Sequence, residues 1–331
     1  MTRSLLFAAI LAMTACAKQA GPEASAAAVE IPVESPVMAR EVSTPHQSVI
    51  NRLPKDGTLV KVINTGDEPR RELRFSPEPG PAGTMRMVME MGITMGVNDR
   101  AVPQVAIPPM VMDMAVEVQA IDEDGNIHFS AELVAVDVSE DADTPSDLTE
   151  TLRADLERMV GMLSVGVVTA TGETIESSTS MPEGTPDELS AHMDNMDKAI
   201  SQLAQPMPDE AVGVGAKWET LSRVPAGGLD LAQQTMTEII AWEGDRVTVR
   251  TTVLQTPIRL SMDVPEMPGV TATVSDFISK GSGESVIDLT SMTPVHAESD
   301  MDTDLTLEMS VGDMSQETHQ HMTLSMTMEM L

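Results

Sequence analysis

The sequence predicts a mainly β fold of the α+β type: a large curved antiparallel sheet, or half-barrel, with two helices inserted in mid-chain. Three observations predict it. Apolar and polar residues alternate over long stretches, as in strands that bury one face. Two segments with helical spacing, 145–163 and 186–204, interrupt these stretches. The chain contains one cysteine in 331 residues, so an internal disulfide is excluded and the core alone must hold the fold.

The first strand-rich half covers residues 57–138. In segment 85–95 an apolar residue, usually methionine, occupies every odd position, and segment 110–118 alternates in the same way. Segment 122–126, Asp-Glu-Asp-Gly-Asn, is a turn signal between two such stretches, which predicts a hairpin. Because alternate side chains of a strand share a face, the methionines are expected on the buried face of the sheet.

The first predicted helix is segment 145–163. Thr144 is a suitable N-cap, Pro145 suits the first helical position, and Asp147 places an acid in the first turn. Leucines and methionines then recur every three or four residues along one side. The second helix, segment 186–204, has a similar start, with Thr185 as N-cap, Pro186 at the first helical position and acids at 187 and 188, and a similar apolar stripe.

Strands are also predicted between and after the helices. Residues 164–179 have the pattern of a short hairpin with its turn at 171–173, and the second strand-rich half covers residues 215–331. Within it, Glu-Gly-Asp at 243–245 is a turn signal, and segment 322–330 alternates methionine or leucine with polar residues. The sequence leaves open whether the two strand-rich halves form one sheet or two domains.

Composition limits the partners of the chain. It has 52 Asp and Glu residues against 20 Lys and Arg, a net charge of −32. Such a surface repels nucleic acid and anionic membranes, which argues against both as partners. Solvation in a saline habitat is the simplest explanation of the charge. With 28 methionines, no tyrosine and 2% aromatic residues, the core is expected to be aliphatic and adaptable.

The N-terminus has a short apolar segment that ends at a cysteine. Arg3 precedes an apolar run over residues 5–12, and small residues lead to Cys16. This arrangement resembles a bacterial lipoprotein precursor, in which residues 1–15 would be a cleaved signal peptide and Cys16 would be lipidated. A secretory signal with an incidental cysteine is the alternative. Ala17, rather than aspartate, follows the cysteine, and by the same resemblance this implies a periplasm-facing, lipid-anchored position at the outer membrane.

A tether and one folded domain are expected to follow the signal peptide. Residues 16–48, rich in Ala, Pro and Glu, are expected to form the lipidated cysteine and a flexible tether. Residues 49–331 are expected to form a β-rich periplasmic domain. The order of strands, two helices and strands resembles the half-barrel periplasmic carriers of lipoproteins and lipids, and segment 206–218 looks like a motif of uncharacterised bacterial lipoproteins. The first resemblance implies architecture and the second implies kinship, and neither carries a functional residue. Segment 206–218 is expected to be a loop that enters a strand, with its glycines setting the turn and Trp218 packing.

These observations favour a non-enzymatic lipoprotein whose apolar cavity holds a lipid or acyl chain. Flexible methionines suit ligands of variable shape. The expected cavity residues are Met87, Met89, Met112, Met114, Met326 and Met328. The same residues would also build a packed core, so a structural or interaction lipoprotein without a small ligand is the first alternative. Its protein partner is not indicated by the sequence.

A methionine-rich copper-handling protein is the second alternative, because thioether sulfurs select Cu(I). His319 and His321 fall at odd positions while the methionines of 322–330 fall at even ones, so a regular strand separates them onto opposite faces. Asp300, Asp302 and Asp304 share a face and could bind a hard cation, but a solvated edge strand is favoured. No metal site or cofactor is predicted.

The sequence lacks the common catalytic signatures. The sequence has no nucleophile elbow of the GxSxG type, no HExxH metal motif and no phosphate-binding glycine loop. His192, on the second predicted helix at the rim of its apolar stripe, is expected to be a surface residue. No catalytic residue is predicted.

Overall fold

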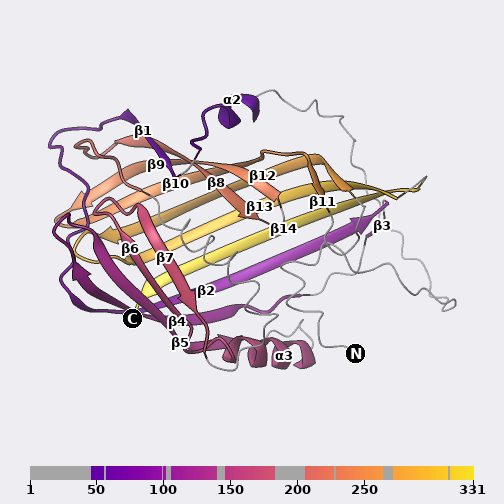
Figure 1. Cartoon of the computed structure of the whole chain (residues 1–331), viewed down its shortest axis with the longest axis horizontal. Coiled ribbons are helices and arrows are strands. Elements are labelled where there is room, and N and C mark those ends of the chain that lie inside the picture. The colour runs from indigo at the N-terminus through magenta and orange to yellow at the C-terminus, as the bar shows by residue number, and fades with distance from the viewer. Residues whose placement is uncertain are drawn as a thin grey trace.

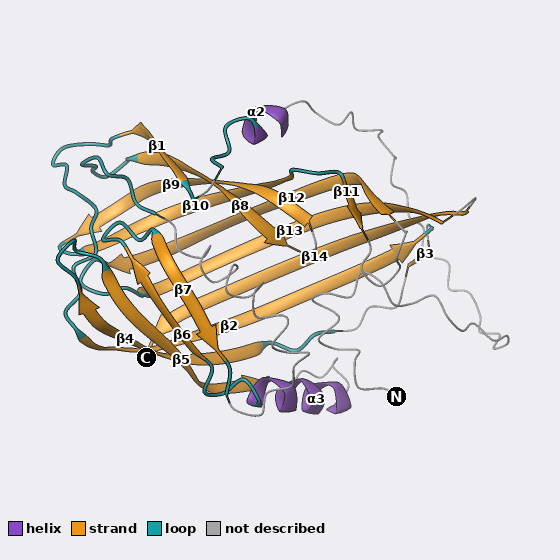
Figure 2. Cartoon of the chain, in the orientation of Figure 1, coloured by secondary structure: helices purple, strands orange, loops and turns teal. Residues whose placement is uncertain are grey.

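All described strands of the protein belong to one antiparallel sheet of 14 strands, which confirms the predicted fold class (Figures 1 and 2). The sheet is not closed, and its edge strands are β1 (Leu59–Asn64) and β7 (Thr174–Ser180). The computed structural model describes residues 46–55, 57–98, 100–101, 106–139, 146–182, 206–226, 229–263, 271–311 and 314–331.

Twelve strands follow one path, in the order β1-β8-β9-β10-β12-β13-β14-β2-β4-β5-β6-β7, while β3 pairs with β2 and β11 pairs with β12. The remaining bounds are β2 (Gly80–Val97), β3 (Arg100–Ala101), β4 (Met110–Ile121), β5 (Ile127–Val138), β6 (Leu163–Val168), β8 (Lys217–Ala226), β9 (Leu229–Glu243), β10 (Arg246–Pro257), β11 (Ser261–Asp263), β12 (Thr271–Asp288), β13 (Pro294–Val311) and β14 (Met314–Met330).

The two strand-rich halves of the sequence meet in this single sheet. Strand β14 from the second half pairs with β2 from the first, from Thr318 opposite Val97 to Met330 opposite Met85. At one end of the strand order, β1 from the first half pairs with β8 from the second. The four longest neighbouring strands, β12, β13, β14 and β2, form the middle of the sheet (Figure 1).

The sheet curls so that distant strands share one side. Phe75 packs against a core cluster that contains Trp218 of β8 and Val249 of β10, and also against a second cluster that contains Val118 of β4 and Ile127 of β5. Four strands separate β10 from β4 along the path. One side chain can contact both clusters only if the sheet wraps around it. The face that carries these clusters is therefore the concave face.

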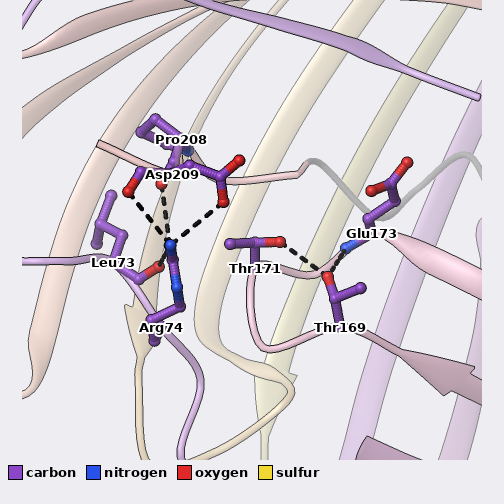
Figure 3. Close-up of polar contacts among 7 residues, drawn as sticks. All are labelled: Leu73, Arg74, Thr169, Thr171, Glu173, Pro208 and Asp209. Carbon is purple, nitrogen blue, oxygen red and sulfur yellow. Dashed lines mark hydrogen bonds and ion pairs between the residues drawn. The ribbon is translucent and has the colours of Figure 1, made fainter. Parts of the chain in front are cut away.

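Three connecting segments, the β1–β2 loop, the β6–β7 turn and the loop before β8, meet at one end of the curved sheet. The Phe75 N–H donates to the Ala170 carbonyl at 2.8 Å, and the Met207 N–H donates to the Thr171 carbonyl at 2.8 Å. Arg74 ties the loops together through bonds to backbone carbonyls and to Asp209 (Figure 3). In the same region, Thr171 and the Glu173 N–H bond to the Thr169 hydroxyl (Figure 3).

Segment 206–218 is a loop that enters strand β8, as expected from the sequence. Gly213 lies so close to the facing loop that a Cβ there would be 1.9 Å from the Asp67 carbonyl oxygen, so a larger residue is excluded. Gly215 has φ +82°, a conformation that glycine adopts without strain. Trp218 then enters the core at the start of the strand, with 3% of its surface exposed.

The predicted helix over 145–163 is shorter than expected. Helix α3 runs over Ser146–Glu157 and packs against β5 through Leu152 and Leu156. The chain then turns at Gly161, which has φ +89° and donates its N–H to the Leu133 carbonyl at 2.8 Å. This bond to a neighbouring strand ends the helix and starts β6. The apolar spacing continued because Met159 and Met162 still enter the core from the turn.

The second predicted helix, 186–204, lies outside the residues that the structure describes. A helix that was not predicted, α2 (His46–Ile50), occupies the end of the expected tether and lies beside β9. Among the described residues, neither helix combines the length and apolar character needed to cross a membrane. The predicted hairpins with turns at 122–126, 171–173 and 243–245 are all confirmed.

Candidate functional site

The two faces of the sheet differ in charge. Side chains alternate between the faces of a strand, and paired residues share a face, so the register assigns each position. On the twelve strands of the main path, every described Asp, Glu, Lys, Arg and His falls on the convex face. On β13, for example, Glu298, Asp300 and Asp302 alternate with the concave residues Ser299 and Met301.

Methionines from three neighbouring strands stand side by side on the concave face. Each row across β4, β2 and β14 contains one methionine per strand, at the spacing of about 4.8 Å between strands. The rows are Met114–Met85–Met330, Met112–Met87–Met328 and Met110–Met89–Met326. All six expected cavity residues belong to this group, which we name the methionine array.

The methionine array is neither fully buried nor fully open. Met110 is 6% exposed and lies in the core cluster with helix α3, whereas the six expected cavity residues are half-buried. Met89, Met112 and Met114 pack against that cluster, so α3 covers the β4 side of the array. The described part of the chain therefore leaves these six methionines partly accessible, whereas a fully packed core would bury them.

Small and hydroxylated residues replace methionine farther along the concave face, over β9, β10, β12 and β13. One row contains Thr237, Thr251, Gly283 and Ser299 before it reaches Met326 of the array. At Gly283 a Cβ would lie 2.6 Å from the Glu298 carbonyl oxygen, so the neighbouring strand requires glycine here. These small side chains form the floor of the concave face beside the methionine array.

A chain of polar side chains crosses this floor in the next part of the sheet. Gln233 of β9, Gln255 of β10, Ser279 of β12 and Thr303 of β13 are consecutive in register. The Gln255 Nε2 atom lies 2.9 Å from Gln233 Oε1, the Ser279 Oγ atom 3.0 Å from Gln255 Oε1, and Ser279 Oγ 2.8 Å from Thr303 Oγ1. We name these four residues the polar chain.

A small pocket lies where the concave face approaches the end of β2. It has a volume of about 10 Å³, room for about one water molecule, and its lining includes Met95, Leu305 and Gln320. Thr318, also in this lining, has a buried hydroxyl without a hydrogen-bond partner among the described residues. This pocket is too small for an acyl chain.

The convex face holds the group of residues that could bind a metal ion. Asp302, Asp304 and His321 place ligand atoms within 4.8 Å of one another. They are exposed or half-buried, His321 Nδ1 is 2.9 Å from Asp304 Oδ1, and Lys280 is opposite Asp302 in register. The prediction of an edge strand for these aspartates was wrong, because β13 lies between β12 and β14 and only its convex face is solvated.

The histidines separate from the methionine array, as the alternation predicted. His319 and His321 face the convex side and bond to Thr306 and Asp304, while Met322 faces the concave side opposite Thr303 and Ile93. Among described residues, mixed ligation by histidine and the array is thus excluded by the register. Cys16 and His192 lie outside the described residues.

One ion pair on the convex side, between a partly exposed arginine and a buried glutamate, was not predicted from the sequence. Arg52, just after α2, bonds to both carboxylate oxygens of Glu219 at 2.6 and 3.0 Å. The Glu219 side chain is 6% exposed, and it also accepts a hydrogen bond from Gln234. The guanidinium of Arg52 lowers the pKa of Glu219 below its usual range, against the opposing effect of burial. This pair attaches α2 to strands β8 and β9.

Comparisons of the chain with known protein-family models and with curated proteins give no match.

Proposed function

We propose that this protein is a non-enzymatic, lipid-anchored periplasmic lipoprotein whose concave face binds a lipid or acyl chain. The observation that carries the proposal is the separation of charge. In a chain with net charge −32, the concave side of the twelve-strand path presents no ionisable side chain among its described positions. Within this uncharged face the methionine array is an apolar surface that remains partly accessible, and such a surface is characteristic of a ligand or partner site.

The chemistry of the face suits a hydrocarbon chain. Methionine side chains are unbranched and polarisable, so the array can adapt to chains of different length and shape. The floor of glycine, serine and threonine beside it leaves space that larger side chains would fill. An acyl chain carries no charge, so the face would not need to neutralise any along its length. The anchor at Cys16 would hold this face close to a source of lipid.

The test compares two serine-to-tryptophan variants. Ser299→Trp places an indole on the concave floor, whereas Ser282→Trp places the same group on the exposed convex face of the adjacent strand. The purified full-length chain is extracted with organic solvent, and the extract is analysed by mass spectrometry, while covalently attached lipid remains with the protein. We expect co-purified acyl lipid in the wild type and in Ser282→Trp, and its loss in Ser299→Trp.

Other results would contradict the proposal. A wild-type chain that releases no lipid, and that takes up none when monoacylglycerol is added, would leave the structural lipoprotein as the better explanation. Equal lipid content in both variants would remove the concave face as the site. Thermal unfolding followed by circular dichroism checks that both variants remain folded.

The rows of the methionine array favour one second candidate, the handling of Cu(I). Met112, Met87 and Met328 come from three adjacent strands, and soft thioether ligands select this ion. Titration of the full-length chain with Cu(I) against a competing chelator tests it. Retention of copper that is lost in Met87→Leu, and kept in the convex variant Val88→Leu, would support this function.

A further inference from the structure

We infer that the polar chain binds the carbonyl oxygen of an uncharged acyl ester or amide, through the side-chain amide nitrogen of Gln233. This inference rests on the proposed acyl-binding function and names the class of ligand. It therefore separates neutral acyl lipids from fatty acids and phospholipids.

The hydrogens available in the polar chain determine the direction of its hydrogen bonds. Ser279 has one hydroxyl hydrogen, which it donates to Gln255 Oε1, so Thr303 must donate its own to Ser279. The Gln255 amide nitrogen in turn donates to Gln233 Oε1. All four side chains are thus oriented in one direction. The polar chain therefore ends at the Gln233 amide nitrogen, a hydrogen-bond donor that needs an acceptor.

The amide nitrogen of Gln233 is free to donate a hydrogen bond to a ligand. Gln233 is half-buried, and no described residue accepts a hydrogen bond from its amide nitrogen. The other end of the chain is closed, since Ser279 and Thr303 are 2% and 8% exposed. Hydrogen bonds in such a chain polarise one another, which makes the terminal N–H a better donor. A ligand that offers a carbonyl oxygen satisfies it.

The described concave positions around Gln233 carry no charge. The concave positions nearest to Gln233 in register and along the strand are Ser222, Leu231, Thr235 and Gln255. No described position on the concave side of the main path is a cation. A phosphate or carboxylate head group placed here would lose its water without gaining a counter-charge, which is unfavourable. A neutral ester or amide avoids this cost.

The position of the polar chain also fits a ligand with a hydrocarbon tail. Its row continues from Thr303 directly to Met322 of β14 and Ile93 of β2. The adjacent row contains Met301, Leu324 and Met91. A carbonyl at Gln233 would thus lie at one end of a surface that becomes apolar toward the methionine array.

The experiment uses two probes that differ by one carbonyl oxygen. These are 1-monopalmitoylglycerol, an ester, and 1-O-hexadecylglycerol, the corresponding ether, measured by competition against a fluorescent monoacylglycerol bound to the full-length chain. One neutral hydrogen bond contributes about 1 kcal/mol, so we expect roughly 3- to 10-fold tighter binding of the ester. Palmitate, with its carboxylate, is expected to bind more weakly than the ester.

Two matched variants identify the residue. In Gln233→Leu the preference for the ester over the ether should disappear, while the ether binds as in the wild type. Gln320→Leu makes the same change on the concave face of β14, outside the polar chain, and should keep the preference. Equal binding of ester and ether by the wild type, or a preference that survives in Gln233→Leu, would overturn the inference while leaving acyl binding intact. Failure to bind either probe would overturn the proposed function as well.

Discussion

The concave and convex faces of the same strands follow opposite chemical rules. On the convex face, charged residues pair across strands, as in Arg86 with Asp113 at 2.8 Å and Lys217 with Glu238 at 3.1 Å. On the concave face, the neighbouring positions are uncharged: methionines lie beside Arg86 and Asp113, and Trp218 and Thr237 lie beside Lys217 and Glu238. The difference teaches that a strongly acidic protein can keep an uncharged surface, because alternation along a strand places charged and uncharged residues on opposite faces of a single layer.

The largest test of this comparison is a charge on the wrong face. Met110→Asp places a carboxylate in the cluster beneath α3, where the native side chain is 6% exposed. We expect it to lower the free energy of unfolding by about 4 kcal/mol or to prevent folding, because a buried charge has no partner there. Val111→Asp, at the next position and on the convex face, should cost about 1 kcal/mol or less. Urea denaturation measures both, and similar losses would contradict the assignment of faces.

The second largest change in stability is expected at the ion pair of Arg52 and Glu219 on the convex side. Arg52→Met leaves the Glu219 carboxylate, 6% exposed, without its cation, and should destabilise the protein by about 3 kcal/mol. Arg250→Met removes an exposed partner of Glu284 and should change stability by about 0.5 kcal/mol or less. Both are measured by chemical denaturation. Equal effects would mean that α2 is not attached through Glu219.

The same pair predicts a pH dependence. Arg52 lowers the pKa of Glu219 in the folded chain, so the pair stabilises the protein above the usual glutamate pKa of 4.5. This contribution is lost as the pH falls through the lowered pKa. The difference in stability between wild type and Glu219→Gln should therefore be largest near neutral pH and shrink in acid. A constant difference between pH 7 and pH 3 would show that the charge of Glu219 is not responsible.

The smallest effect compares two threonines on adjacent strands. Thr303→Val removes the hydroxyl that donates to Ser279 in the polar chain, and should cost about 1 kcal/mol because Ser279 is buried. Thr323→Val makes the same change at an exposed convex position and should be close to neutral. Thermal unfolding at a fixed pH resolves the two. If Thr303→Val is also neutral, the polar chain does not contribute to the stability of the fold.

Much of the fold could be predicted because its signals are local. Turn residues such as Gly172 and Gly244, which have positive φ, marked hairpins that the structure confirms. The C-terminus of α3 could not be predicted, because its spacing signal continued to Leu163 while the chain left the helix earlier to bond with Leu133. Arg52 and Glu219 gave no signal either, since 167 positions separate them and neither belongs to a motif.

The sequence by itself determined which residues share a face, because the two-residue period of a strand is a property of each segment alone. It therefore separated His321 from Met322 and grouped Met87 with Met89. Only the tertiary structure decided that Met87 lies between Met112 and Met328, that the shared face is concave, and that Gln233 is linked to Thr303. These features depend on register and curvature, which arise from pairing between segments far apart in the chain, so no local pattern contains them.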